Sequence, residues 1–294
     1  MANLKDIARQ INSVKNTAKT TKAMKLVSSA KLRKAQQLSE QSRSYANKIS
    51  GVLSEIAARV AMVQNDENQS RAFTKIESPK VIDIVFVTSD KGLCGGFNMA
   101  TIKEVRTLLA DYQDKGVQVR LRVAGRKGID YFTFQGVELL QKEVGLSSAP
   151  DYDKAVTFIK SAFEDFNNEI TDQVIVIHNG FVNMLTQELK TQALLPISLD
   201  SVSIDETGSM LDIEPDDSEE VLDELTAKYV NFAMYYSLID SLAAEHSARM
   251  QAMDNATSNA NDRVKDLTVE YNKARQAAIT TELIEIISGV EAQK

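Results

Sequence analysis

The sequence predicts an α/β protein in two parts: a long antiparallel coiled coil of the N- and C-terminal helices, and an α/β domain with a largely parallel sheet between them. Three observations predict this fold class. Glycine and proline are absent over long stretches at both ends, the apolar residues of those stretches recur every 3.5 residues, and the middle alternates strand-like with helix-like runs. A chain of 294 residues is long enough for one large or two ordinary domains.

The C-terminal segment is the longest uninterrupted one. Neither glycine nor proline occurs from residue 216 to residue 288. At about 1.5 Å of rise per residue, such a run spans about 110 Å as a single helix. Alternating steps of three and four residues from Leu222 pass through Tyr229, Ala243 and Leu267 to Ala278 and meet few polar side chains. A 3.5-residue repeat sustained this long is typical of a coiled coil.

The N-terminal segment follows the same repeat, but the centre of its seam is small and polar. An antiparallel hairpin of the two segments is the simplest pairing, because the termini of a domain commonly lie close together. A homodimeric coiled coil is the alternative. The predicted shaft comprises residues 1–60 and 216–294. Its N-terminal seam positions are Leu4, Ile7, Ile11, Val14, Ala18, Thr21, Lys25, Ser28, Leu32, Ala35, Ala46, Ile49, Leu53, Ile56 and Val60.

The last turns of the C-terminal segment are apolar on more than one stripe. A helix that is apolar nearly all round expects burial on every side. The N-terminal helix has no matching length to cover these turns, so we infer a sheath made by other chains. The residues concerned are Ile279, Leu283, Ile284, Ile286, Ile287 and Val290.

The middle of the chain, residues 78–205, is expected to form a Rossmann-like α/β domain. The strand-like runs VIDIVFVT, VQVRLRVAG and QVIVIHNGF alternate with the helix-like runs MATIKEVRTLLADYQ and DKAVTFIKSAFEDFNN, and a helical turn is expected near KGIDYFTF. This alternation is the pattern of a parallel sheet with crossover helices.

Charge is unevenly distributed along the chain. The net charge is −7, yet residues 1–50 hold eleven Lys or Arg against Asp6 and Glu40, and residues 200–224 hold eleven acids and no base. Such asymmetry marks surfaces that meet charged partners, although a solvated helix face is the alternative for any single run. For the basic helix, a nucleic acid and an acidic protein surface remain open. The charged start MANLKDIARQ is unlike a signal peptide, so we expect a cytoplasmic protein.

The stretch TSDKGLCGGFN, residues 88–98, raises the possibility of a phosphate-binding loop. Its glycines, Gly92, Gly95 and Gly96, match neither G-x-G-x-x-G nor the G-x-x-x-x-G-K of P-loop enzymes. A strand-to-helix turn is therefore the favoured interpretation. One cysteine, Cys94, and two histidines exclude disulfides and Cys/His zinc sites within one chain. We expect no catalytic, metal or cofactor-binding residues.

Four motifs in order then point to a family. The stretches TTKAMKLVSSAKLRKAQ, TSDKGLCGGFN, ARMQAMDNATSNA and YNKARQAAITTELIEIISG together resemble, over essentially the whole chain, the γ subunits of bacterial F-type ATP synthases. The resemblance implies a coiled coil inside a ring of alternating α and β subunits, with the α/β domain against the ε subunit and the c ring. It also implies that catalytic residues belong to the partners and that this chain transmits torque.

The resemblance assigns partner contacts by position. Met24, Lys25, Lys31, Arg33 and Lys34 match the segment that passes the acidic loops of β, and Lys91 and Cys94 belong to a turn within reach of the same loops. Arg275, Gln276 and Thr280 match a polar contact with a catching loop of β, and Leu211, Ile213 and Glu214 match the part that faces the c ring.

The same resemblance implies a peripheral protein on the cytoplasmic face of the cell membrane, with no nucleic-acid partner and no nucleotide bound directly. Two alternatives of other classes are a nucleotide-dependent α/β enzyme with helical arms and a nucleic-acid-binding coiled coil. Tight ATP binding by the isolated chain would favour the first, and salt-dependent DNA retention the second.

Overall fold

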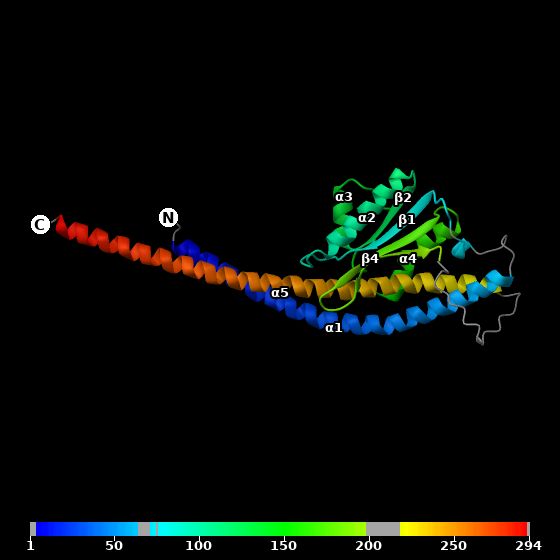
Figure 1. Ribbon diagram of the computed structural model, residues 1–294, viewed down its shortest axis with the longest axis horizontal. Helices are drawn as coiled ribbons and strands as arrows, with labels where there is room; N and C mark the ends of the chain where they lie inside the picture. The colour runs from blue at the N-terminus through cyan, green and yellow to red at the C-terminus, as the bar shows by residue number, and fades with distance from the viewer. Residues whose placement is uncertain (1–3, 64–70, 75, 198–217, 293–294) are drawn as a thin grey trace. The chain divides into compact units, whose positions relative to one another are not determined.

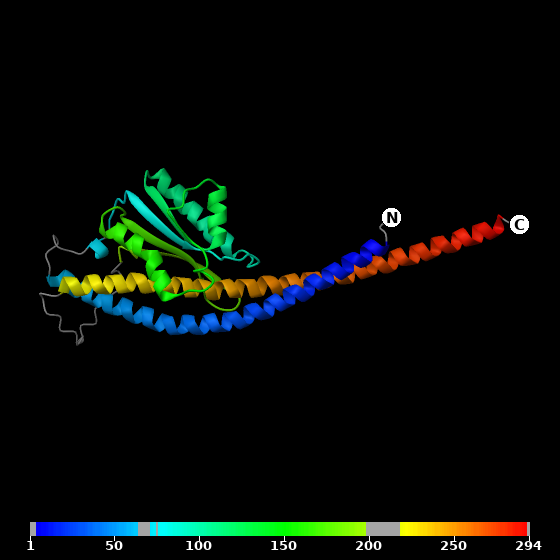
Figure 2. The same ribbon diagram turned by 180° about the vertical axis from the view of Figure 1, so that it is seen from behind.

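The computed structural model describes residues 4–63, 71–74, 76–197 and 218–292 (Figures 1 and 2). By its internal contacts the chain divides into two compact units. The first unit takes in α1 up to Ser29 and α5 from Arg249 onward, and the second runs from Ala30 to Ala248. The elements are α1 (Leu4–Val63), a 3₁₀ turn (Arg71–Phe73), β1 (Val81–Val87), α2 (Phe97–Asp114), β2 (Gln118–Ala124), α3 (Arg126–Phe134), β3 (Gln141–Glu143), α4 (Tyr152–Asn167), β4 (Gln173–Phe181), β5 (Gln187–Leu195) and α5 (Ser218–Glu291).

The second unit is built on a five-stranded sheet in the order β3-β2-β1-β4-β5. All neighbours are parallel except β5, which runs antiparallel to β4. The predicted largely parallel sheet is confirmed. Sequence analysis did not predict β5, because its residues QELKTQALL mix polar and apolar types and only the last two are buried. An exposed edge strand lacks the continuous apolar run that identified β1 and β4.

The two faces of the sheet carry separate cores, divided by the alternation of side chains along each strand. Ile82, Ile84 and Phe86 of β1 pack with residues of α2 and α3. Val85 and Val87 point the other way and pack with residues of α4, α1 and α5. Figure 1 shows this arrangement, with α2 and α3 on one side of the sheet and α4 on the side of the long helices. Burial on both faces explains the unbroken apolar run of β1.

A buried ion network lies on the face of the sheet that α4 covers. Arg122 Nε and Arg120 Nε donate to the two oxygens of Asp83, at 2.8 and 2.5 Å, and both guanidinium groups also donate to Asp165 of α4. Burial lowers the pKa of Arg120, but the bonds to Asp83 and Asp165 outweigh it and raise that pKa. The network joins β1, β2 and α4, and a buried charge of this kind is tolerable only because it is paired.

In the second unit, α1 and α5 run antiparallel. The Tyr45 ring lies 4.4 Å, centroid to centroid, from the Phe232 ring, and further along α1 Leu53 shares a core with Leu222, earlier in α5. The predicted hairpin of the two terminal helices is therefore formed within one chain. On α1 the buried residues of this part keep the 3,4 spacing of the seam, namely Leu32, Ala35, Ser39, Ser42 and Leu53.

The glycine most tightly required by the fold is Gly125, between β2 and α3. Its φ is +118°, and a Cβ there would lie 2.0 Å from the carbonyl oxygen of Thr88. We expect Gly125→Ala to lower the free energy of unfolding by about 3 kcal/mol or more, from backbone strain plus overpacking. Chemical denaturation of the full chain measures this change in the free energy of unfolding.

A control for that substitution is available in α1. Gly51 is helical, and no heavy atom lies within 4 Å of a Cβ built on it. Gly51→Ala should raise the free energy of unfolding by about 0.5–1 kcal/mol, since alanine loses less backbone entropy than glycine in a helix. Equal effects of the two substitutions would contradict the steric account of Gly125.

Candidate partner-binding surfaces and the closed ligand crevice

The stretch TSDKGLCGGFN forms the turn from β1 to α2, as predicted. Asn98 holds it together, because its Oδ1 accepts from the Ser89 amide at 2.9 Å and its Nδ2 donates to the Cys94 sulfur at 3.3 Å. Asp90 reaches the next connection, where its carboxylate accepts from the Arg126 amide at the start of α3 and from the Gly145 amide. A carboxylate of this chain thus occupies a position at a helix N-terminus that suits an anion.

The glycines of this turn serve chain reversal at one position only. Gly95 has a positive φ of 59°, and so does the non-glycine Leu93, at 64°. Gly92 and Gly96 have negative φ, and a Cβ on either meets nothing closer than 3.9 Å. Close packing therefore does not require glycine at Gly92 or Gly96. Close backbone approach falls instead on Gly125 and Gly128, in the next strand-to-helix connection.

The crevice where a doubly wound sheet holds a ligand is filled in this chain. In this sheet order it lies beyond the carboxyl ends of β1 and β4, where the chain continues from β1 toward β2 on one side and from β4 toward β5 on the other. Here Cys94 and Phe97, from the β1–α2 turn and the start of α2, pack with Ala244 and Ala248 of α5 in one buried cluster. Phe181, the last residue of β4, lies against that cluster. Helix α5 therefore occupies the place of a ligand.

A buried carboxylate ties the same stretch of α5 to β4 and β5. Asp240 Oδ2 accepts from Lys190 Nζ at 2.7 Å and lies 3.3 Å from His178 Nε2, while Oδ1 accepts from the Phe181 amide at 3.1 Å. Burial alone would raise the pKa of Asp240, but the bonds from His178 and Lys190 outweigh it and leave that pKa below its usual value. A Cβ at Gly180 would lie 2.8 Å from the Asp240 oxygen, so glycine gives the carboxylate its room.

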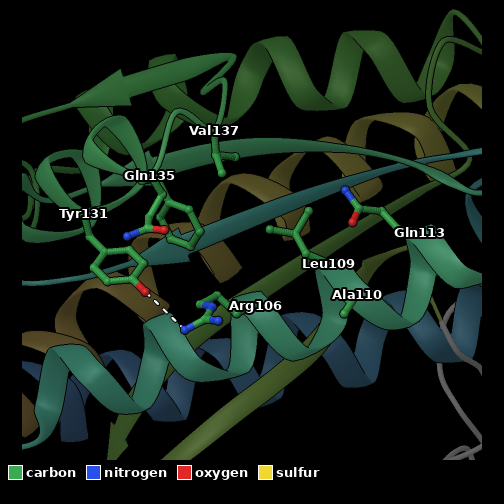
Figure 3. Close-up of a pocket in the computed structure, with 8 residues that line it drawn as sticks. Arg106, Leu109, Ala110, Gln113, Tyr131, Gln135 and Val137 are labelled. Carbon is green, nitrogen blue, oxygen red and sulfur yellow. Dashed lines mark hydrogen bonds between the residues drawn. The ribbon is translucent and has the colours of Figure 1, made fainter.

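A shallow groove runs between α2 and α3 (Figure 3). It encloses about 220 Å³ and is mostly apolar, with Arg106 donating to the Tyr131 hydroxyl at 3.3 Å across it. Gln113, near the end of α2, and Val137, after α3, also line it. These positions follow the two helices away from the carboxyl ends of the strands, so the groove is not the ligand crevice of the fold.

The basic residues predicted to meet acidic loops are divided between the two units. Lys31, Arg33 and Lys34 lie in the second unit and are exposed on α1. Met24 and Lys25 lie in the first unit and are half-buried, and Lys25 Nζ donates to Asp254 of α5 at 2.7 Å.

Of the two residues predicted in the β1–α2 turn, Lys91 is exposed, whereas Cys94 is only 2% exposed. The thiol of Cys94 faces the cluster beneath α5, so it supports the turn from inside. The predicted c-ring contacts, Leu211, Ile213 and Glu214, lie outside the described residues.

The end of α5 carries the third predicted contact. Arg275, Gln276 and Thr280 are all exposed, and the Thr280 hydroxyl donates to the Gln276 carbonyl of its own helix. The apolar residues of the last turns are each more than half exposed within this chain, which leaves their predicted sheath to other chains; they are Ile279, Leu283, Ile284, Ile286, Ile287 and Val290.

Comparison with known proteins identifies the family. The family model described as ATP synthase matches residues 3–293. The ATP synthase gamma chain of Aliarcobacter butzleri is 66% identical over 295 residues, and the alignment covers all of both chains. That of Wolinella succinogenes is 54% identical over 304 residues, covering all of this chain and 99% of the relative.

The chain belongs to the ATP synthase gamma-chain family. It is therefore a stalk subunit of the ATP synthase complex and is not itself catalytic. The resemblance found in the sequence is confirmed.

Solved structures of the family share the fold. A chain of the central stalk and c-ring of the Tetrahymena thermophila mitochondrial ATP synthase is 25% identical, with a TM-score of 0.59 over 81% of this chain and 99% of that one. A chain of the Euglena gracilis mitochondrial ATP synthase, at 18% identity, gives a TM-score of 0.67 over 99% of this chain and 94% of that one. Along the described ranges, none of the helices is long and apolar enough to span a bilayer.

Sequence analysis missed the Asp240 cluster of this gamma chain. Its three side chains come from β4, β5 and α5, and His178 and Asp240 are 62 residues apart. The one available signal was a charged residue, Asp240, directly after the seam position Ile239 in a turn with no other charged residue. That signal does not name the partners.

The Asp240 cluster predicts a specific pH dependence. Asp240→Asn should lower the free energy of unfolding by about 1–2 kcal/mol at neutral pH, because His178 and Lys190 lose a charged acceptor, although Lys190 is itself about a third exposed and can be solvated. Since the folded pKa lies below the reference value of 3.8, the stabilisation is fully present above 3.8 and is lost as pH falls through the folded pKa. The difference in the free energy of unfolding between the parent chain and the Asp240→Asn variant should therefore become smaller below about pH 4.

Chemical denaturation of the full chain over pH 3–7 measures that difference. Asp262→Asn is the control, because Asp262 is an exposed acid paired only with Lys265 three residues later in its own helix. The control should leave the denaturation midpoint unchanged. If Asp240→Asn lowers the free energy of unfolding by the same amount at pH 3 and at pH 7, the stabilising group is not the charged carboxylate of Asp240.

Proposed function

We propose that this gamma chain is the central rotor shaft of a bacterial ATP synthase, transmitting torque between a proton-driven c ring and a catalytic ring of α and β subunits. The observation that carries the proposal is the sheet unit packed onto two long antiparallel helices, with the ligand crevice closed by the shaft itself. Solved structures with the same fold, one of a central stalk with its c-ring and one of a rotor, support the same partners. The ε subunit is a further proposed partner of the sheet unit.

The shaft would comprise residues 1–60 and 216–294, and the basal domain residues 78–205. The two compact units cut across this division, because Ala30–Ala248 includes both sheet and helix. The division is by role: the long helices lie within the ring of subunits, and the sheet connects them to the membrane sector.

Contact with the catalytic ring is proposed to run through two kinds of surface. Exposed lysines and arginines of α1 and the β1–α2 turn, namely Lys31, Arg33, Lys34 and Lys91, would face acidic loops of β, with Met24 beside them and Cys94 supporting the turn. Arg275, Gln276 and Thr280 would meet a polar loop of β. Leu211, Ile213 and Glu214 are proposed to face the c ring.

The last turns of α5 are proposed to be sheathed by the ring. Six apolar side chains lie on several faces of this end of the helix, and each is more than half exposed. Moving them from water into an apolar sleeve lowers their free energy. Assembly would therefore bury this end of α5 without any partner segment from the same chain.

A nucleotide-dependent enzyme is the alternative of another class. The filled crevice disfavours it, because Phe97, Ala244 and Ala248 lie where a dinucleotide would enter and Asp90 would repel a phosphate at α3. Two measurements distinguish the hypotheses. A rotor shaft is expected to co-purify with two larger nucleotide-binding subunits. Tight ATP binding by the isolated chain would overturn the proposal.

The location is proposed as the cytoplasmic face of the cell membrane, with attachment through the c ring and not through a span of its own. The relatives named as ATP synthase gamma chains support a place in that membrane-associated complex.

The basic surface predicts a modest effect on coupling. Replacing Lys31, Arg33 and Lys34 together with alanine should lower ATP-driven proton pumping per ATP hydrolysed by less than about half, because screened pairs exposed to water contribute only about 0–1 kcal/mol each. Raising the salt concentration should reduce the difference. Complete loss of pumping with assembly intact would contradict a sliding, low-friction contact.

The exposed apolar residues at the end of α5 predict an effect on the thermal stability of the assembled complex. Leu283→Ser with Ile287→Ser removes two large apolar side chains one turn apart and should lower the thermal midpoint of the assembled complex, since each loses about 1.5–3 kcal/mol of burial. Glu282→Ser with Glu285→Ser is the control for helix propensity in the same turns. An unchanged midpoint in the first variant would argue against burial there.

A further inference from the structure

Polar contacts between α1 and α5 in the first unit include a hydroxyl pair and an ion pair. The hydroxyls of Thr21 and Thr257 lie 2.7 Å apart, and Lys25 Nζ donates to Asp254 Oδ1, also at 2.7 Å. Thr21 is a seam position and is only 8% exposed. The two contacts lie on adjacent turns of the antiparallel pair.

The hydroxyl pair has a consistent direction. Thr257 donates its hydrogen to the carbonyl oxygen of Met253 at 2.7 Å, so its oxygen accepts from Thr21. The Thr21 hydroxyl is farther, at 3.2 Å, from the carbonyl oxygen of Ala18 in its own helix. The hydrogen bonds therefore run in series from the Thr21 hydroxyl of α1 through the Thr257 hydroxyl to the Met253 carbonyl of α5. This series forms only when Thr21 lies opposite Thr257.

The ion pair is equally specific to this register. No acidic residue occurs in the sequence between Asp6 and Glu40, and Asp254 is the only acid between Glu245 and Asp262. A slip of one heptad in either direction would bring Ser247 or Asn261 to the place of Asp254. Lys25 would then face a neutral side chain.

The apolar part of the seam selects the register only in part. Near these contacts Ala18, Ser28 and Ala260 are buried and small, and Met253 is buried and large. The small side chains exchange for one another in a slip, so Met253 and the polar pairs are the groups that distinguish one register from the next. Polar side chains in a coiled-coil seam commonly fix register at some cost in stability, because a misplaced one loses its bond.

We propose that the Thr21–Thr257 and Lys25–Asp254 pairs set the axial register of the two shaft helices, which makes Lys25 a positioning residue inside the chain and not a contact to a partner. The consequence for coupling rests on the proposed rotor function. A shaft whose helices slide past one another presents altered surfaces to the ring and converts part of the applied torque into slip.

Charge-swap variants test the proposal: Lys25→Asp, Asp254→Lys, and the two combined. Lys22→Asp is the control, because Lys22 is exposed, lies off the seam and undergoes the same change of charge. Register is read in the full chain as the disulfide yield between Val14→Cys and Val264→Cys, seven residues before Thr21 and seven after Thr257. Coupling is read in the reconstituted complex as protons pumped per ATP hydrolysed.

Each single swap should lower the disulfide yield about two- to fivefold and lower coupling, the combined swap should restore both, and Lys22→Asp should change neither. A combined swap that stays defective in coupling while the disulfide forms normally would show that Lys25 meets acids of a partner, and would overturn the proposal. Single swaps without effect on the disulfide would overturn it too. A changed disulfide yield with normal coupling would support the register and count against the rotor role assigned to it.

Discussion

The packing of α5 across the carboxyl ends of β1 and β4 is the constraint on which the sheet unit depends. Ala244 and Ala248 are small enough for the helix to reach the strand ends, and Asp240, one turn earlier, binds both β4 and β5. The same contact closes the ligand crevice of the fold and fixes the sheet on the shaft. A doubly wound domain thereby loses a binding site and gains a rigid attachment, which suits a chain that transmits force and leaves nucleotide chemistry to its neighbours.

Two buried charge clusters make that attachment stiff. The pairs of Asp83 and Asp165 with Arg120 and Arg122 join α4 to the sheet, and Asp240 joins α5 to it. Such clusters contribute little net stability, because desolvation offsets most of the attraction. Their bonds have direction, however, whereas apolar contacts tolerate small slides. Polar networks on the α4 and α5 side of the sheet therefore hold both helices in one orientation relative to the strands.

How far the sequence predicted the structure depended on whether the signal was local. The heptad seam was predictable because a 3.5-residue repeat marks each helix separately, and the buried positions Ile7, Ala18, Met253 and Leu267 follow it. The strands β1 and β4 were equally visible as apolar runs. The edge strand β5 and the Asp240 cluster were not, because a half-exposed strand has a mixed pattern and the partners of Asp240 are set by tertiary packing. Glycine content did not locate the steric demand either: a Cβ has room at Gly92 and Gly96 of the glycine-rich turn, whereas it would clash at Gly125.

The two kinds of contact along α5 divide the tasks of a shaft. Polar pairs such as Thr21 with Thr257 are satisfied in one register only, so they give specificity within the chain at little gain in stability. The last turns of α5 have the opposite character. Ile284, Ile287 and their apolar neighbours cover several faces of the helix, so burying them favours no particular rotation of the helix about its axis. In the proposed rotor, an apolar surface without directional bonds would let a sleeve hold the helix while the helix turns inside it. Specific bonds would then lie where the proposed register prevents sliding, and non-directional burial where the proposed rotation requires freedom.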